Sequence, residues 1–199
     1  MLSLRYITAL AATTALAAAC SSDTEQADEA ATEAVSTSEV ADVDHTDPIA
    51  SAMAAAPAAV SSAATIVTMG ADGSMTTLRE GPNGFTCMGD NPATPGPDPM
   101  CMDSNAMEWA MAWIGKQPPP TDKPGVMYML AGGTDASNTD PYATGPSEGG
   151  AWIETGPHMM VVGSQAALNG YPDAAEPDTS VPYVMWAGTP YAHLMIPVE

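Results

Sequence analysis

Hydrophobic residues after about position 64 come in short runs, separated by clusters of glycine, proline and aspartate. Such runs are typical of β-strands joined by turns. The runs at 65–69 and 74–78 flank Gly-Ala-Asp-Gly at 70–73, which predicts a β-hairpin. Further strands are predicted at 125–131, 183–186 and 193–198, with one more over 152–162 that Gly156 and Pro157 interrupt, as in a bulged or edge strand.

One segment, 104–114, has the periodicity of a helix. Met107, Met111 and Ile114 recur on one helical face, and Gly115 follows as a natural end. The pattern therefore predicts an α+β, mainly β domain: a small antiparallel sheet with this one helix. The sheet is expected to form a sandwich or a half-open barrel.

The first 19 residues have the pattern of a signal peptide. Arg5 precedes an apolar, alanine-rich stretch, which is shorter than the about 20 apolar residues that a membrane-spanning helix needs. Small residues lead into Cys20, and this resembles the lipobox of bacterial lipoproteins, although Leu16 stands one place earlier than usual. The resemblance implies a lipid on Cys20; ordinary cleavage that leaves Cys20 unmodified is the alternative. The expected location is the bacterial cell envelope, as an outer-membrane lipoprotein or otherwise exported.

Residues 20–63 contain nine acidic residues and no lysine or arginine, and are otherwise mostly alanine, serine and threonine. They lack the large apolar side chains that offset the entropy of folding, so we predict a disordered acidic tether. His45 lies in this segment and is expected to be exposed. A single folded domain is then expected over 64–199.

The charge of the chain limits its partners. Its 24 acidic and 4 basic residues give a formal net charge of −20. Such a surface repels phosphates, which excludes nucleic acids as partners. The expected partners are the membrane, through the lipid anchor, and an unknown ligand or protein of the envelope.

Cys87 and Cys101 are the only cysteines besides Cys20. A pair of cysteines in an exported chain predicts a disulfide, here around a loop rich in proline, glycine and aspartate. A redox or metal-thiolate pair is the alternative, but the spacing is not Cys-x-x-Cys.

Methionine is unusually frequent: 13 methionines follow residue 64, against 4 leucines and 4 isoleucines. They can serve simply as flexible core residues. However, His158 and Met160 form a His-x-Met string, and so do His193 and Met195. Residues two apart share a face of a strand, so neighbouring strands would join these four side chains into a site for Cu(I), which thioethers favour.

Oxygen-bearing side chains are concentrated in the loop after residue 131. Asp135, Asn138 and Asp140 could bind Ca²⁺ or line a ligand site, although the spacing is not that of an EF-hand and the same residues are common in turns. Ser137 with either domain histidine and an aspartate could form a hydrolase site, but no Gly-x-Ser-x-Gly surrounds it. Tyr142 lies in the same polar loop and is a candidate ligand contact.

Five segments resemble a family of exported bacterial proteins of unknown function: NGFTC (83–87), DPMC (98–101), ASNTDP (136–141), GPHMM (156–160) and TPYAHLMIPV (189–198). The resemblance covers most of the expected domain and implies a single exported domain, with no activity attached.

Together these patterns favour binding or scaffolding at the cell envelope over catalysis. The loops 88–100 and 132–150 are the expected functional surface, because recognition is often carried by loops on a rigid scaffold. The alternatives are a periplasmic copper-handling protein and a small secreted hydrolase.

Overall fold

The computed structural model describes residues 44–71 and 73–198. The predicted signal peptide, Cys20 and most of the predicted tether lie outside the described residues. Within the described part, strands dominate and helices are few, so the predicted mainly β, α+β class is confirmed. No helix of this part is long and apolar enough to cross a bilayer.

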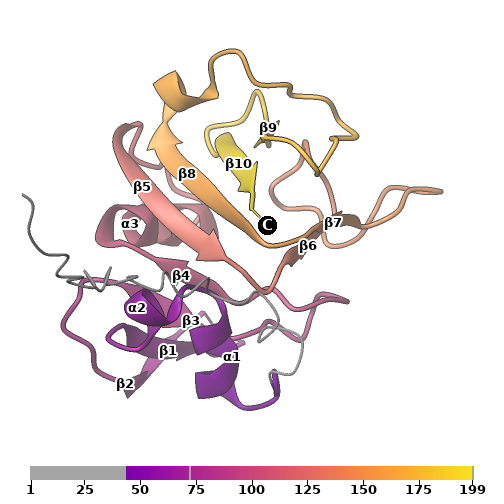
Figure 1. Ribbon diagram of the computed structural model, residues 1–199. Helices are drawn as coiled ribbons and strands as arrows, with labels where there is room; N and C mark the ends of the chain where they lie inside the picture. The colour runs from indigo at the N-terminus through magenta and orange to yellow at the C-terminus, as the bar shows by residue number, and fades with distance from the viewer. Residues whose placement is uncertain (1–43, 72, 199) are drawn as a thin grey trace, which may run out of the picture. The chain divides into compact units, whose positions relative to one another are not determined.

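Most strands belong to one open sheet, with the order β2-β1-β3-β4-β5-β8-β10-β9 (Figure 1). These strands are β1 (Thr65–Met69), β2 (Met75–Arg79), β3 (Thr86–Met88), β4 (Met100–Met102), β5 (Asp122–Met129), β8 (His158–Ser164), β9 (Tyr183–Met185) and β10 (His193–Pro197). All neighbours pair antiparallel except β1 and β3, which are parallel. The sheet is therefore larger than predicted, and it is mixed.

Two local predictions at the β2 end of the sheet are confirmed. β1 and β2 form the predicted antiparallel hairpin. Cys87 on β3 lies directly opposite Cys101 on β4, and the two form the predicted disulfide. The disulfide therefore closes the loop between β3 and β4, and residues 89–94 of this loop line a cavity.

The pairing register brings ten of the chain's 15 methionines to one side of the sheet, which we call the methionine face. Directly paired residues share a face, and so do residues two apart in a strand. Met160 in β8, for example, pairs with Met127 on one side and Met195 on the other. The methionine face carries Met69, Met75, Met88, Met100, Met102, Met127, Met129, Met160, Met185 and Met195.

Helix α3 (Ser104–Ile114) has the predicted bounds and covers part of the methionine face. Asp103 caps its start, accepting a hydrogen bond from the Ala106 backbone N–H at 2.7 Å. Gly125 in β5 lets the helix approach, because a Cβ there would lie 2.3 Å from the Ala106 nitrogen. The helix thus places Trp109 and Trp113 over the thioethers.

Two short helices, α1 (Pro48–Ala54) and α2 (Ala58–Ser61), lie on the opposite face of the sheet (Figure 1). They cover the part of that face near β1 and β3. Ala52 and Ala55 are fully buried against Ile66 and the disulfide. Residues 48–61 therefore form packed helices, where the sequence pattern suggested a tether. We predicted disorder here because large apolar side chains are lacking, but the small side chains of this segment pack closely enough to bury it.

A second, two-stranded sheet pairs β6 (Gly133–Asp135) with β7 (Ile153–Thr155). β8 lies inside the large sheet, between β5 and β10, and is followed by the 3-10 helix η2 (Gln165–Leu168). The single interrupted edge strand predicted over 152–162 is therefore wrong. Gly156 and Pro157 separate two strands of different sheets.

Candidate binding cavity

A cavity of about 1140 Å³ is bounded by the methionine face, α3 and two loops. Eight of the ten methionines of that face line it, all except Met75 and Met102. The loop segments 89–94 and 136–144 contribute further lining, so both loops that the sequence singled out border this one space. All three histidines and all four tryptophans of the chain also line it.

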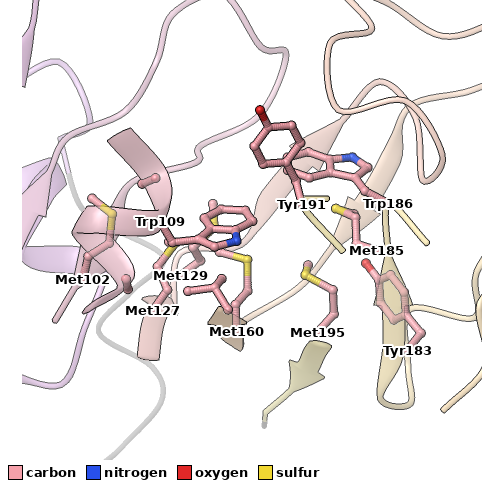
Figure 2. Packing of buried hydrophobic residues seen from close by; sticks show 13 residues of the cluster. Met102, Trp109, Met127, Met129, Met160, Tyr183, Met185, Trp186, Tyr191 and Met195 are labelled. Atoms are coloured by element: carbon pink, nitrogen blue, oxygen red, sulfur yellow. The ribbon is translucent and has the colours of Figure 1, made fainter. Parts of the chain in front are cut away.

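The side chains at the centre of the cavity are apolar and close together. Met160 and Met195 lie side by side on the sheet beneath Trp109, with Met185 and Trp186 next to them (Figure 2). The Trp109 and Trp186 rings are nearly parallel, with centroids 6.4 Å apart. The flexible thioether side chains of the sheet thus face the rigid aromatic rings of Trp109 and Trp186, which we call the aromatic wall.

His158 begins β8 and is 1% exposed. Its Nδ1 lies 2.7 Å from the Gly156 carbonyl oxygen. Because a carbonyl can only accept, Nδ1 carries the hydrogen and Nε2 is left as an acceptor. Nε2 is buried and has no hydrogen-bond partner among the described residues. Burial lowers the pKa of His158, although the bond to Gly156 opposes this, so the imidazole is neutral at pH 7.

His193 begins β10 and is buried in the same way, with Nδ1 3.0 Å from the Tyr191 carbonyl oxygen. Its ring stands edge-on to Trp109 and Trp186, at centroid distances of 5.3 and 4.9 Å. Burial, aided by charge on His158, lowers the pKa of His193 to about 4, although the hydrogen bond to Tyr191 opposes this. This imidazole is also neutral at pH 7.

Trp186 is held in an unusual backbone conformation, with φ of 55°. A non-glycine residue adopts this left-handed region at a cost of about 1 kcal/mol or more. The indole Nε1 donates to the Ser137 carbonyl at 3.0 Å, and the backbone N–H donates to the Asn138 carbonyl at 2.7 Å. The Asn138 side chain in turn donates to the carbonyls of Ala174 and Val184. These bonds fix the indole at the cavity wall.

The four residues predicted to bind copper lie on one face of neighbouring strands. Met160 and Met195 are directly opposite, while His158 pairs with Pro197 and His193 with Met185. The two histidines therefore stand two residues beyond the methionine pair, in opposite directions. Their separation along the strands is about 13 Å. The set is a row of four side chains and not a compact square.

Carboxyl groups occupy another part of the lining. Burial, aided by the negative charge of Asp98, raises the pKa of Asp135 to about 7. Burial also raises the pKa of Asp98 to about 6, with a contribution from Asp90, against hydrogen bonds from the Asn91 N–H and the Thr94 hydroxyl. The charge on this side of the cavity therefore changes close to neutral pH.

Two of the three residues predicted to bind calcium, Asn138 and Asp140, have other partners. The Asn138 amide is bonded to backbone carbonyls, and Asp140 Oδ1 accepts from the Tyr142 N–H at 2.9 Å. In the described part of the chain, no three His, Cys, Asp or Glu side chains gather as a metal site. Asp135 and Asp140 line the cavity, whereas Asn138 is a buried structural residue.

The residues of the hydrolase alternative have structural contacts. Ser137 Oγ accepts hydrogen bonds from the backbone N–H groups of Thr139 and Asp140, which is the arrangement of a local turn. Both His158 and His193 donate Nδ1–H to a carbonyl and not to a carboxylate. The orienting acid of a catalytic triad is therefore not paired with either of these histidines.

Tyr142, the predicted ligand contact, is 37% exposed. Its hydroxyl donates to the Trp113 carbonyl at 3.0 Å, and its ring meets Tyr191 edge-on at 5.8 Å. Lys116 Nζ lies 4.7 Å from the ring centroid. Tyr142 thus braces the outside of the aromatic wall, while its neighbour Ala143 lines the cavity.

Several residues that line the cavity were not predicted from the sequence. His45 is half-buried, with Nδ1 3.3 Å from Ser51 Oγ, and is not an exposed tether residue. Met127 and Met129 alternate in β5 with half-buried residues of the opposite face of the sheet, a period of two that was readable in the sequence. Met185 joins the site only through the pairing of β9 with β10, which no local pattern reveals.

No protein-family model, curated protein or solved structure matches the chain.

Proposed function

We propose that the chain is a non-catalytic binding protein that holds an apolar small molecule in the methionine-lined cavity. The observation that carries this proposal is the cavity itself, which has a volume of about 1140 Å³. Ligand pockets typically measure about 300–1,000 Å³, have mainly apolar walls and contain a few fixed polar groups. The chain's three histidines and four tryptophans all border this one space, which favours a role in recognition.

The lining suits a ligand with flat, apolar surfaces. Methionine side chains adapt to irregular shapes and interact well with aromatic rings. Trp109 and Trp186 offer indole surfaces whose positions are fixed by packing and hydrogen bonds. His158 Nε2 supplies a buried acceptor for a ligand donor group. Such a site orients a ligand without altering it.

We further propose that the protein acts in the cell envelope, anchored by a lipid on Cys20 and facing an envelope ligand. The signal-like sequence of residues 1–19 and the lipobox-like approach to Cys20 support this location. The Cys87–Cys101 disulfide is consistent with it, because disulfides persist in oxidising compartments.

The binding proposal can be tested with N-phenyl-1-naphthylamine, a neutral apolar probe whose fluorescence rises in apolar surroundings. We expect saturable binding of one probe per chain. Replacing Ala136 and Ala143 by Phe places two rings in the cavity and should weaken binding at least tenfold, whereas the same change at the exposed Ala59 and Ala175 should not.

Two outcomes would contradict the proposal. One is the absence of saturable probe binding by the folded wild-type chain. The other is equal binding by both double variants, which would place the probe elsewhere. Circular dichroism of each variant establishes that the fold is retained.

A further inference from the structure

Within residues 44–71 and 73–198, the buried imidazole of His158 lacks a hydrogen-bond partner for one of its nitrogens, which buried polar groups normally have. Its Nε2 lone pair has no partner in the described part of the chain, although the side chain is 1% exposed. Buried acceptors without a partner are rare and destabilising, so each one needs an explanation. A bound group that accepts the lone pair of Nε2 would explain why none of the described residues pairs with this nitrogen.

A thioether side chain lies close to the imidazole of His158. Met129 in β5 lies directly opposite His158 in β8. A Cβ placed on Gly133 would be 3.0 Å from Met129 Cε, 3.1 Å from His158 Cε1 and 3.8 Å from His158 Nε2. The two side chains therefore border the same small space, which the absence of a side chain at Gly133 leaves open.

A second thioether belongs to the same group. Met160 is two residues after His158 and shares its face of β8, and both line the cavity. Met195 lies directly opposite Met160 in β10 and continues the row. The imidazole thus shares its face of the sheet with one thioether on the paired strand and another on its own strand.

The chemistry of these donors selects the ion. Thioethers are soft ligands that favour Cu(I), whereas calcium requires oxygen ligands and structural zinc is usually held by four thiolate, imidazole or carboxylate groups. Both cysteines of the described part are joined in the disulfide, and no three His, Cys, Asp or Glu side chains gather there. The donors near His158 therefore fit monovalent copper and not the harder divalent ions.

The hydrogen bonding of His158 also suits metal binding through Nε2. Metal-binding histidines usually donate their other ring N–H to a carbonyl or carboxylate, which fixes the ring and its tautomer. The 2.7 Å bond from His158 Nδ1 to the Gly156 carbonyl does this. Lowering of the pKa by burial adds to the effect, because it keeps the imidazole unprotonated.

We propose that Cu(I) binds in the floor of the cavity to His158 Nε2 and the thioethers of Met129 and Met160. This site replaces the four-residue cluster suggested by the sequence, because His193 stands beyond the methionine pair, edge-on to two indoles. It shares His158 with the proposed site for apolar molecules, but it rests on the unpaired imidazole and not on the cavity volume, so the two proposals can fail separately.

The test is an anaerobic titration of the purified, disulfide-intact chain with Cu(I), in competition with bicinchoninate, using ascorbate as a reductant that spares disulfides. We expect one tightly bound Cu(I) per chain. Met129→Leu, Met160→Leu and His158→Gln should each weaken binding at least tenfold. Met111→Leu changes an exposed methionine outside the cavity and should have no effect.

X-ray absorption should show sulfur and nitrogen neighbours of copper in the wild type, with less sulfur in the two leucine variants. These leucine variants nearly conserve volume and keep the fold testable if His158→Gln does not fold. Failure of the folded wild type to retain Cu(I) would overturn the assignment. Equal losses in Met111→Leu, or a loss in His193→Gln as large as in His158→Gln, would also overturn it.

The same samples separate the two proposals. Loss of Cu(I) binding with intact binding of N-phenyl-1-naphthylamine counts against the copper site alone. Bound Cu(I) without probe binding counts against the apolar ligand alone.

Discussion

Replacing Asp135 by Asn removes a titratable carboxyl group from the cavity lining. Burial and the negative charge of Asp98 raise the pKa of Asp135 from 3.8 to about 7. The folded state therefore favours the protonated carboxyl. The stabilisation by its proton is fully present below pH 3.8 and is lost as the pH rises through about 7.

The magnitude follows from the pKa difference. Each pKa unit corresponds to about 1.4 kcal/mol, so the full loss between pH 3.8 and 7 is about 4 kcal/mol. Between pH 5 and pH 8 it is roughly 3 kcal/mol, because titration of the folded state is nearly complete at pH 8. Asn does not titrate, so Asp135→Asn should stabilise the protein more at pH 8 than at pH 5, by this difference.

The wild-type pH profile alone would not reveal this effect. The pKa of His193 is lowered to about 4, so its neutral form is favoured by folding and its contribution is lost as the pH falls below 6.5. That loss opposes the gain from Asp135 in the same pH range. Comparing the variant with the wild type at each pH cancels the histidine contribution.

The measurement is urea unfolding, followed by circular dichroism at pH 5 and pH 8 with the disulfide intact. Asp173→Asn, at an exposed position, corrects for the change in net charge. The reasoning is refuted if the free energy of unfolding of Asp135→Asn rises equally at both pH values, or rises more at pH 5.

Three further variants test the fold and the anchor. Gly125→Ala should destabilise the domain by about 1–3 kcal/mol in urea unfolding, since its Cβ would meet the Ala106 backbone at 2.3 Å; unchanged stability would contradict this close approach. Changing Cys87 and Cys101 to Ser should cost roughly 3 kcal/mol in the same assay, from a sequence separation of 14, and an unaltered midpoint would show that the disulfide contributes nothing. Cys20→Ala should abolish labelling of the expressed chain by an alkyne-bearing fatty acid, and persistent labelling would exclude Cys20 as the lipidated residue.

Features determined by neighbouring residues could be predicted from the sequence. The hairpin of β1 and β2 follows from its turn, and α3 follows from its periodicity and its end at Gly115. The disulfide follows from counting cysteines. Each of these depends on a signal within about 15 residues.

Features determined by long-range pairing could not be predicted in this way. The central position of β8 and the alignment of Met160 with Met195 depend on strand order, which single runs do not encode. The helix α1 was missed because its buried face consists of Ala52 and other small residues, although Asp47 and Pro48 form a recognisable helix start. Composition suggested disorder where close packing of small side chains sufficed.

The methionine face has a chemical consequence that a leucine face would not have. Oxidants convert a thioether to a sulfoxide, which is polar and no longer adapts to apolar surfaces. Met88 and Met100, which are partly exposed at the cavity, should react before the fully buried Met102. Oxidative stress would therefore make the cavity lining polar while the fold persists, until methionine sulfoxide reductases restore the thioethers.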